Sequence, residues 1–267
     1  MQDTKEIGVR RFGGVNWLGL WTLSKREVLR FWVVWTQTIV APLVTGGLFL
    51  LIFDTAIGER RGEILGVPFI TFIAPGIMMM AVIQNAFANA SSSLVISKVQ
   101  GNIVDTLMPP LSGGELLVGY LCGAVVRGII VAFGLWVGLE LVLGIGLAHP
   151  ILALVYVVLG GLLMGGLGVI AGIYANKFDQ MAAITNFIVT PMAFLSGSFY
   201  SVSALPPVLQ TLTWGNPIFY MIDGLRFAVL GVSDSDPVHG LGVGIMSVVC
   251  VNLGAWIMLR SGYRLKP

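Results

Sequence analysis

The sequence predicts an all-α integral membrane protein with six transmembrane helices. Of its 267 residues, 56% are hydrophobic and 10% are charged, and the mean hydropathy is +0.91. Soluble domains carry about 25% charged residues, so this composition indicates an apolar environment. The apolar residues fall into six runs of roughly 20 residues, the length that crosses a hydrocarbon core. We expect one membrane domain over residues 1–267.

Residues 1–30 predict a cytoplasmic tail followed by an interfacial helix. Between Asn16 and Arg30, tryptophan and leucine residues mix with basic ones. This pattern is typical of a helix with one side in lipid and the other at the headgroups. The alternative is that this stretch is only the polar start of the first span.

The six expected spans follow the order of the apolar runs. They are residues 31–53, 68–94, 116–142, 151–174, 181–199 and 240–259. Pro42 predicts a kink in the first span, because proline removes a helical hydrogen bond. Pairs of glycines four residues apart in the fourth span predict close packing against another helix.

The second span becomes polar toward its end, where Asn85 and Asn89 lie one helical turn apart. Amides are costly in lipid, so this side should meet protein or water. Two interpretations stay open: packing against other spans, or lining a pathway together with Phe194, Phe199 and Tyr200.

Residues 96–115 are too polar to span a membrane. We expect a short helix from Ser97 to Met108, ended by Pro109 and Pro110. Its charged residues Lys98 and Asp105 are either solvated or contacts for a partner.

Residues 200–236 combine prolines and glycines with many aromatic residues. Irregular backbone at membrane depth survives only where protein or a water-filled cavity covers it, so we expect a re-entrant helical element. Asp223 and Arg226 are three residues apart and suited to pairing on one helix face. The candidate residues of this element either hold its fold or form a gate: Pro206, Trp214, Asn216, Pro217, Tyr220, Asp223 and Arg226. Its aromatic residues fit an interfacial belt or a ring facing a substrate.

Basic residues gather at the two termini and beside the expected cytoplasmic loops. The positive-inside rule therefore places both termini in the cytoplasm, residues 96–115 on the same side, and the re-entrant element outside.

Motifs for energy conversion are missing from the sequence. It has no phosphate-binding Gly-x-x-x-x-Gly-Lys-Ser/Thr loop and no metal-binding His/Cys spacing. Ser196 and Ser198 suggest a membrane hydrolase only weakly, because His149 and His239 are expected at outer loops. Arg127 and Glu140 are the only acidic or basic residues inside an expected span, and both lie off-centre, which weakens the case for a stand-alone carrier. We expect no enzyme activity, metal or cofactor in this chain.

Two segments carry a family resemblance. Leu205–Arg226 reads LPPVLQTLTWGNPIFYMIDGLR, and Ile103–Leu121 reads IVDTLMPPLSGGELLVGYL. With the order of the elements, they resemble the membrane subunit of ATP-binding-cassette exporters of the type-2 permease kind, over nearly the whole chain. Asn102 to Asp105 depart from the Gly-Thr-Leu-Glu that the family usually carries before its prolines.

The resemblance implies a permease of the inner (plasma) membrane that forms its pathway as a dimer. A separate ATPase subunit would bind ATP and magnesium, and no nucleic acid is expected as a partner. The ATPase would contact the coupling segment, with Lys98, Asp105, Thr106, Leu107 and Met108 as candidates. The substrate would be a drug, a lipid-linked glycan or a similar amphipathic molecule. The alternative function is a stand-alone secondary transporter or channel.

Overall fold

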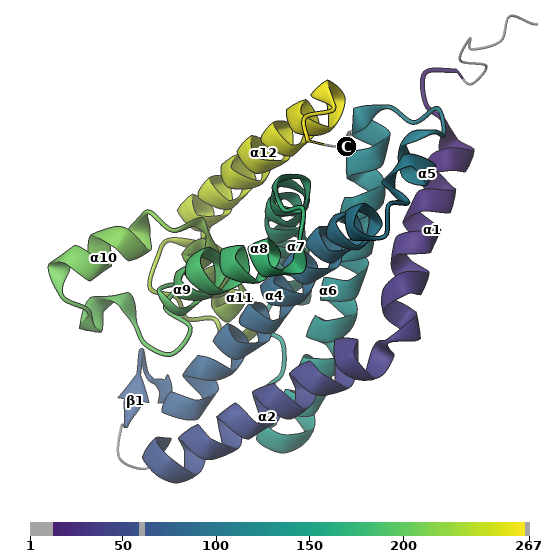
Figure 1. Cartoon of the computed structure of the whole chain (residues 1–267). Helices are drawn as coiled ribbons and strands as arrows, with labels where there is room; N and C mark the ends of the chain where they lie inside the picture. Colours follow the sequence, from purple (N-terminus) through teal and green to yellow (C-terminus); the bar gives the residue numbers. More distant parts are fainter. Residues whose placement is uncertain (1–12, 59–61, 265–267) are drawn as a thin grey trace, which may run out of the picture.

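The computed structural model describes residues 13–58 and 62–264. Long helices cross most of the molecule from one end to the other (Figure 1). The start of α1, the short helix α5 and the end of α12 lie at one end, and β1 lies toward the other. The expected tail, residues 1–12, falls outside the described residues.

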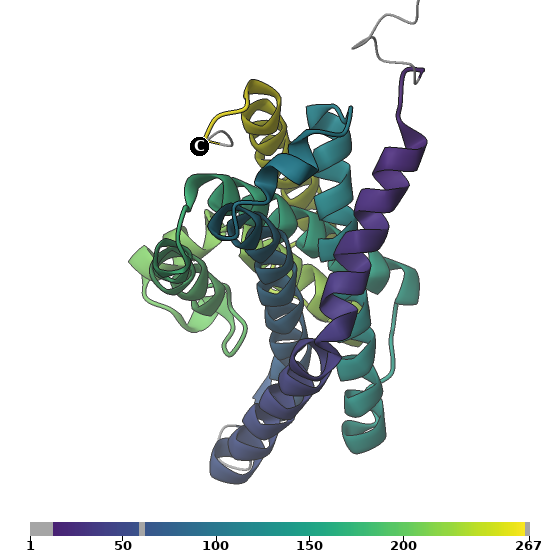
Figure 2. The same ribbon diagram turned by 45° about the vertical axis from the view of Figure 1, so that its right-hand side comes forward.

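The first long apolar run is divided into several helical stretches. These are α1 (Trp17–Val33), the π-helical η1 (Thr36–Val40), α2 (Ala41–Phe53) and the π-helical η2 (Asp54–Gly58). α1 is therefore a helix separate from the following span, as the sequence predicted, and it extends three residues further than expected. The chain bends between α1 and α2 (Figure 2), where Val34 leaves the helical conformation with φ −108° and ψ 37°; Pro42 lies in the first turn of α2, and the residue before it is helical.

A two-stranded hairpin, which the sequence did not predict, leads into the second long helix. Its strands are β1 (Glu63–Ile64) and β2 (Val67–Pro68), with Ile64 paired to Val67. Leu65 and Gly66 make the turn with positive φ values of 52° and 78°. The helix that follows is α4 (Phe69–Val99).

The expected coupling helix is shorter than predicted. α4 continues to Val99, so Lys98 lies in its last turn and not in a separate helix beginning at Ser97. Gly101 reverses the chain with a φ of 73°, and α5 (Ile103–Leu107) follows. α6 (Gly113–Leu143) then begins with a capping box between Ser112 and Glu115.

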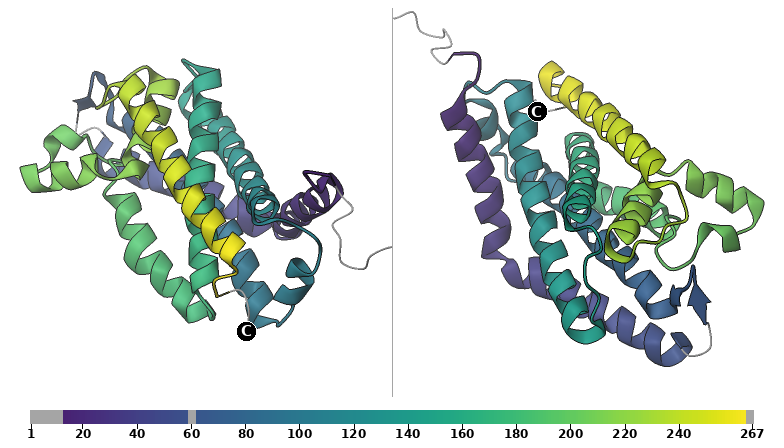
Figure 3. Two further views of the ribbon diagram at one scale, coloured as in Figure 1. Left: turned by 90° about the horizontal axis from the view of Figure 1, so that it is seen from above. Right: turned by 180° about the vertical axis from the view of Figure 1, so that it is seen from behind.

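The remaining helices complete the bundle and the outer segment. They are α7 (Pro150–Tyr174), α8 (Phe178–Ile184), the π-helical η3 (Thr185–Val189), α9 (Thr190–Phe194), the 3₁₀ turn η4 (Val202–Ala204), α10 (Pro207–Trp214), α11 (Pro217–Leu230) and α12 (Pro237–Ser261). The short helices α10 and α11 agree with the broken element predicted before the last span. In Figure 3, α12 lies across the outside of the bundle, and α10 projects from one end.

Within the described residues, five helices are long and apolar enough to cross a membrane. They are Thr36–Ala56, Phe69–Val99, Gly113–Leu143, Pro150–Tyr174 and Pro237–Ser261. The sixth expected span, residues 181–199, is the continuous helical stretch 178–194, which is shorter than the usual 20 residues. It ends early because the chain turns at Gly197, with a φ of 69°. The structure therefore supports an all-α membrane protein without confirming the count of six.

The core lies where α4, α6 and α7 pack together, and glycines bring these helices close. A Cβ placed on Gly168 would lie 2.6 Å from the carbonyl oxygen of Phe87. At Gly165 it would lie 2.9 Å from Cβ of Ala124. The predicted role of the glycine pairs in close packing is thus confirmed for α7.

α2 and α12 lie on the outside of this core. Only 6% of the most apolar window of the first span is buried, and 11% of that of α12. Both helices therefore leave apolar side chains uncovered, among them Leu48 and Leu51 of α2 and Met246 and Val249 of α12.

Candidate functional site

A groove of about 310 Å³ runs along α2 where this helix faces α4 and α9. We call it the membrane groove. Its wall joins amide and hydroxyl groups to aromatic rings: Gln37, Ala41, Pro42, Thr45, Gly46, Phe49, Ile77, Met80, Ala81, Gln84, Asn85, Phe194 and Phe199. Three of the five predicted pathway residues, Asn85, Phe194 and Phe199, therefore meet in one groove.

The aromatic part of the membrane groove is a packed set of rings. The ring centroids of Phe194 and Phe199 are 5.9 Å apart, and Phe49 of α2 lies 6.2 Å from Phe199. Tyr200 is outside the groove lining, and its hydroxyl donates to the carbonyl of Phe194 at 3.1 Å. This grouping places aromatic rings between α2 and the end of α9 with the turn that follows it.

Asn85 and Asn89 have different surroundings although they are one turn apart. Asn85 lines the membrane groove, and its Oδ1 accepts hydrogen bonds from Nε and Nη2 of Arg127 at 3.1 and 2.7 Å. Asn89 is fully buried beneath α1, where its Oδ1 accepts from Arg30 at 3.1 Å. For Asn89 the structure thus favours the packing interpretation, whereas Asn85 reaches the candidate pathway.

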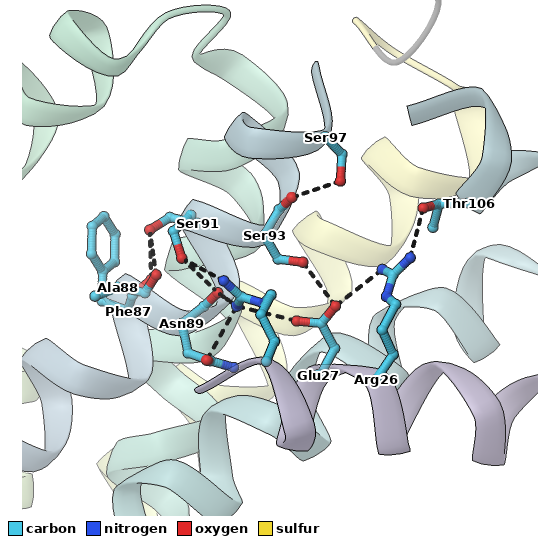
Figure 4. Close-up of polar contacts among 11 residues, drawn as sticks. Arg26, Glu27, Phe87, Ala88, Asn89, Ser91, Ser93, Ser97 and Thr106 are labelled. Carbon is cyan, nitrogen blue, oxygen red and sulfur yellow. Dashed lines mark hydrogen bonds and ion pairs between the residues drawn. The ribbon is translucent and has the colours of Figure 1, made fainter. Parts of the chain in front are cut away.

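Glu27 is a fully buried carboxylate on α1. Its Oε1 accepts from Nη2 of Arg26 at 3.0 Å and from Oγ of Ser93 at 2.8 Å. Its Oε2 accepts from Nη2 of Arg30 at 3.2 Å. Figure 4 shows Glu27 between α1 and α4, with Arg26 reaching on to Thr106. We call Arg26, Glu27, Arg30, Asn89 and Ser93 the α1 cluster.

The α1 cluster needs α1 to lie very close to α6. A Cβ on Gly119 would be 2.4 Å from Cδ2 of Leu23, and one on Gly123 would be 2.6 Å from Cβ of Glu27. At the start of α1, the backbone N–H of Asn16 donates to Oε1 of Glu115 at 2.6 Å. Small residues on α6 therefore fix the position of α1 along its length.

The predicted coupling residues divide into an inner and an outer set. On α5, Ile103 and Thr106 are buried, and Oγ1 of Thr106 accepts from Nη1 of Arg26 at 3.0 Å. Asp105 and Met108 are exposed on the other side, and Leu107 is half-buried. A groove of about 330 Å³ separates the start of α1 from α5.

Lys98 is held by the end of α7. Its ammonium donates to the backbone carbonyl of Ile173, to that of Ala175 at 3.3 Å and to Oδ1 of Asn176 at 3.4 Å. It thereby satisfies carbonyl groups that the helix end leaves without intrahelical partners.

The predicted pair of Asp223 and Arg226 is present and fully buried, with Nη1 3.1 Å from Oδ1. Asp234 lies 3.5 Å from the same nitrogen. Arg226 also donates to the carbonyl of Gly197 at 2.6 Å, and its guanidinium lies 4.0 Å from the centroid of the Phe72 ring. Asp223, Arg226 and Asp234 form what we call the outer ion cluster, which joins α11 to α4 and to the turn at Gly197.

The side chain of Asp234 lies in the loop before α12, outside the spanning helices. Burial raises the pKa of its carboxyl, while a hydrogen bond from Ser201 and the charge of Arg226 lower it. The carboxyl of Asp234 therefore connects this loop to Arg226 through an ion pair and to Ser201 through a hydrogen bond.

Other predicted outer residues support the same segment. Asn216 caps α11 by accepting from the N–H of Ile218 at 3.0 Å, and it donates to the carbonyl of Met192 at 2.7 Å. The hydroxyl of Tyr220 donates to the carbonyl of Trp214 at 3.0 Å. Pro206 and Pro217 stand at the starts of α10 and α11. These contacts favour a role in holding the fold, and a gating role stays a prediction.

The two candidate serines have no arrangement for nucleophilic catalysis with the histidines. Ser196 and Ser198 lie 3.2 Å from each other through their hydroxyl oxygens. His149 stacks on Phe227 at 5.4 Å, and His239 lies against Tyr220. The histidines thus belong to other contacts in the structure.

Sequence reasoning missed the α1 cluster. It placed Arg26, Glu27 and Arg30 on the polar side of an interfacial helix, whereas Glu27 is inside the protein. A glutamate flanked by arginines one residue before and three after was the available signal, because buried carboxylates require such partners.

Three comparisons with known proteins bear on this arrangement. The model of the family described as ABC-2 type transporter matches residues 19–230. The inner membrane transport permease YadH of Escherichia coli K12 is 36% identical over 251 residues, covering 94% of this chain and 98% of that protein. Nodulation protein J of Rhizobium leguminosarum bv. viciae is 25% identical over 253 residues, covering 93% and 95%.

The family match includes α4, α5, α6 and α11, which hold the membrane groove, the coupling residues and the outer ion cluster. The similarity to the transport permease extends over nearly the whole of both chains. The chain therefore belongs to the ABC-2 type transporter family, as an integral membrane permease.

Proposed function

We propose that this chain is the membrane subunit of an ATP-driven exporter of the inner membrane, with two copies forming the pathway and a separate ATPase supplying the energy. Family membership indicates a non-catalytic membrane subunit. One observation carries the proposal: the membrane groove is lined by the exposed Gln37 and Gln84 and the half-buried Asn85, beside a helix that is almost unburied. A half-open polar groove fits one wall of a pathway.

A second copy would supply the missing wall. Amide groups facing hydrocarbon are costly because lipid offers them no hydrogen bonds. Placing two membrane grooves opposite each other would cover both sets of amides and enclose a route lined by amides and aromatic rings. Such a route suits an amphipathic substrate, a drug or a lipid-linked glycan.

The ATPase would dock on the exposed side of α5. Asp105 and Met108 point outward, while Ile103 and Thr106 fix the helix from inside. Because Arg26 joins α5 to α1, a push on α5 would move α1 as well. Both termini would lie in the cytoplasm on this arrangement.

The proposal is tested with the purified full chain and with the ABC ATPase encoded beside it. We expect no ATP hydrolysis by the chain alone, and a stable complex with the ATPase that hydrolyses ATP and exports substrate. In the complex with Asp105→Lys, we expect ATP hydrolysis without export. Asp236→Lys, at the start of α12, should leave hydrolysis and export coupled. Full-rate transport by the chain alone in vesicles would refute the proposal.

A stand-alone carrier is the second candidate, and the position of Arg127 favours it. This residue lies midway along α6, where an ionisable group often serves coupled transport. Uptake driven by a proton or sodium gradient and lost in Arg127→Gln or Glu140→Gln would support the carrier. Export that needs ATP and ignores both gradients would exclude it.

A further inference from the structure

Basic residues outnumber acidic ones where α1 packs against α4 and α6. Arg26 and Arg30 share the carboxylate of Glu27, and Arg127 donates to Asn85, which lines the membrane groove. Both oxygens of Glu27 are already occupied by the two arginines of α1 and by Ser93. In the part of the chain that the structure describes, the hydrogen bonds of Arg127 go to the neutral amide of Asn85.

Arg127 cannot place its charge at a lipid headgroup. It is near the middle of the 31-residue α6, about 21 Å from the start of the helix and about 24 Å from its end at 1.5 Å per residue. That distance exceeds the length of an arginine side chain. A guanidinium at the centre of a spanning helix costs about 3 kcal/mol on insertion scales and is typical of a functional site.

Arg30 of α1 and Arg127 of α6 both donate hydrogen bonds to α4, at residues on successive turns. Arg30 donates to Asn89, and Arg127 donates to Asn85 four residues earlier. Residues four apart on a helix have Cβ atoms about 6 Å from each other. Each guanidinium group thus donates to a neutral amide, and the two amides are one turn apart on α4.

Basic residues also line a second groove, which lies on α1. This shallow surface groove of about 460 Å³ is lined by Lys25, Arg26, Leu29, Arg30 and others. The membrane groove begins at Gln37, seven residues after Arg30. From the groove on α1 to the membrane groove, the lining thus changes from basic residues to amides and aromatic rings.

We propose that the transported molecule carries an anionic group, a phosphate or a carboxylate, on an apolar body. Arg30 and Arg127 bind the anion, and the aromatic part of the membrane groove receives the apolar body. This inference rests on the proposed function, whose substrate it narrows. It disfavours cationic drugs, because Arg26, Arg30 and Arg127 against the one carboxylate of Glu27 leave a net positive charge that repels them.

Binding to the purified full chain in a neutral maltoside detergent tests the inference without any ATPase. The probe is dodecyl phosphate, compared with dodecylphosphocholine and with inorganic phosphate, and the readout is the concentration that half-saturates the rise in Tm. We expect dodecyl phosphate to bind most tightly of the three. Arg127→Gln should weaken it by about 10-fold or more, since charged hydrogen bonds contribute about 1.5–3 kcal/mol.

The controls separate charge from folding. Arg260→Gln removes an exposed arginine at the end of α12 and should leave binding unchanged. Arg127→Lys keeps the charge and should bind more tightly than Arg127→Gln; if the latter does not fold, Arg30→Gln takes its place. Equal binding of the phosphocholine, equal binding of inorganic phosphate, or an unchanged affinity in both glutamine variants would overturn the inference.

A negative result for the anionic substrate can be told apart from a negative result for the proposed function. An ATP-driven complex whose membrane subunit shows no preference for dodecyl phosphate would remove the anionic substrate alone. Anion binding by a chain that never assembles with an ATPase would remove the exporter while leaving the binding site.

Discussion

Gly123 decides how closely α1 approaches α6. A Cβ at this position would lie 2.6 Å from Cβ of Glu27 and 2.8 Å from Nδ2 of Asn89. We expect Gly123→Ala to displace α1 and to cost about 1–3 kcal/mol of stability, as overpacking does. Gly138→Ala is the matched control on the same helix, because its Cβ would meet nothing within 4 Å and alanine favours the helix. Thermal unfolding in detergent should show a lower Tm for the first variant, and equal Tm values would contradict this account.

Arg226 balances two buried carboxylates, Asp223 and Asp234, at 3.1 and 3.5 Å. Removing one partner of a buried ion pair costs about 3–5 kcal/mol because the remaining charge stays without compensation. We therefore expect Arg226→Gln to lower the Tm and the yield of monodisperse protein strongly. Arg260→Gln, which removes an exposed guanidinium over the Trp256 ring, should change little. Similar Tm values for the two variants would show that the outer ion cluster does not hold α11.

Lys98 joins the end of α4 to the end of α7 through backbone carbonyl groups. We expect Lys98→Gln to lower the stability by about 1 kcal/mol, because charged hydrogen bonds to the helix end are lost. Lys177→Gln is the control, because Lys177 is exposed just beyond the end of α7. If Lys98→Gln alone lowers the Tm, the side chain supports the fold; if it only impairs ATPase coupling at an unchanged Tm, the original assignment to coupling is the better one.

Apolar runs made the long helices predictable, since only a helix satisfies the backbone of such a run in lipid. Their ends were less predictable. The sequence could not show that α4 continues past Ser97, because this depends on where Gly101 adopts its positive φ. The π-helical turns of η1 and η3 also carry no composition of their own.

The candidate site was predictable where neighbours in sequence decide it. Asp223 and Arg226 are one turn apart on α11, so their pairing followed from spacing. Asn85 and Asn89 looked alike in sequence, and only the position of α1 separates the groove residue from the buried one. The contact of Glu27 with Ser93 joins residues 66 positions apart, which no local pattern reveals.

The whole molecule has two long helices at its outside, and their surfaces differ in chemistry. Between Gly240 and Leu259 the exposed side chains of α12 are apolar, with Ile245, Met246 and Val249 among them, so lipid covers this part of the helix without cost. Along α2, the membrane groove adds the amides of Gln37 and Gln84. A second copy therefore gains more by covering α2 than by covering α12.

Disulfide crosslinking between copies tests this choice of face in a chain whose native cysteines are replaced, Cys122→Ser and Cys250→Ser. Leu48 on α2 is 53% exposed and Val249 on α12 is 58% exposed, so Leu48→Cys and Val249→Cys are matched in access. We expect mild oxidation in native membranes to convert most of the Leu48→Cys chain to a covalent dimer on a non-reducing gel. The Val249→Cys chain should stay monomeric, because lipid and not protein faces that position. The reverse pattern would place the second copy against α12, leaving the amides of the membrane groove in lipid and contradicting the physical reason for a shared pathway.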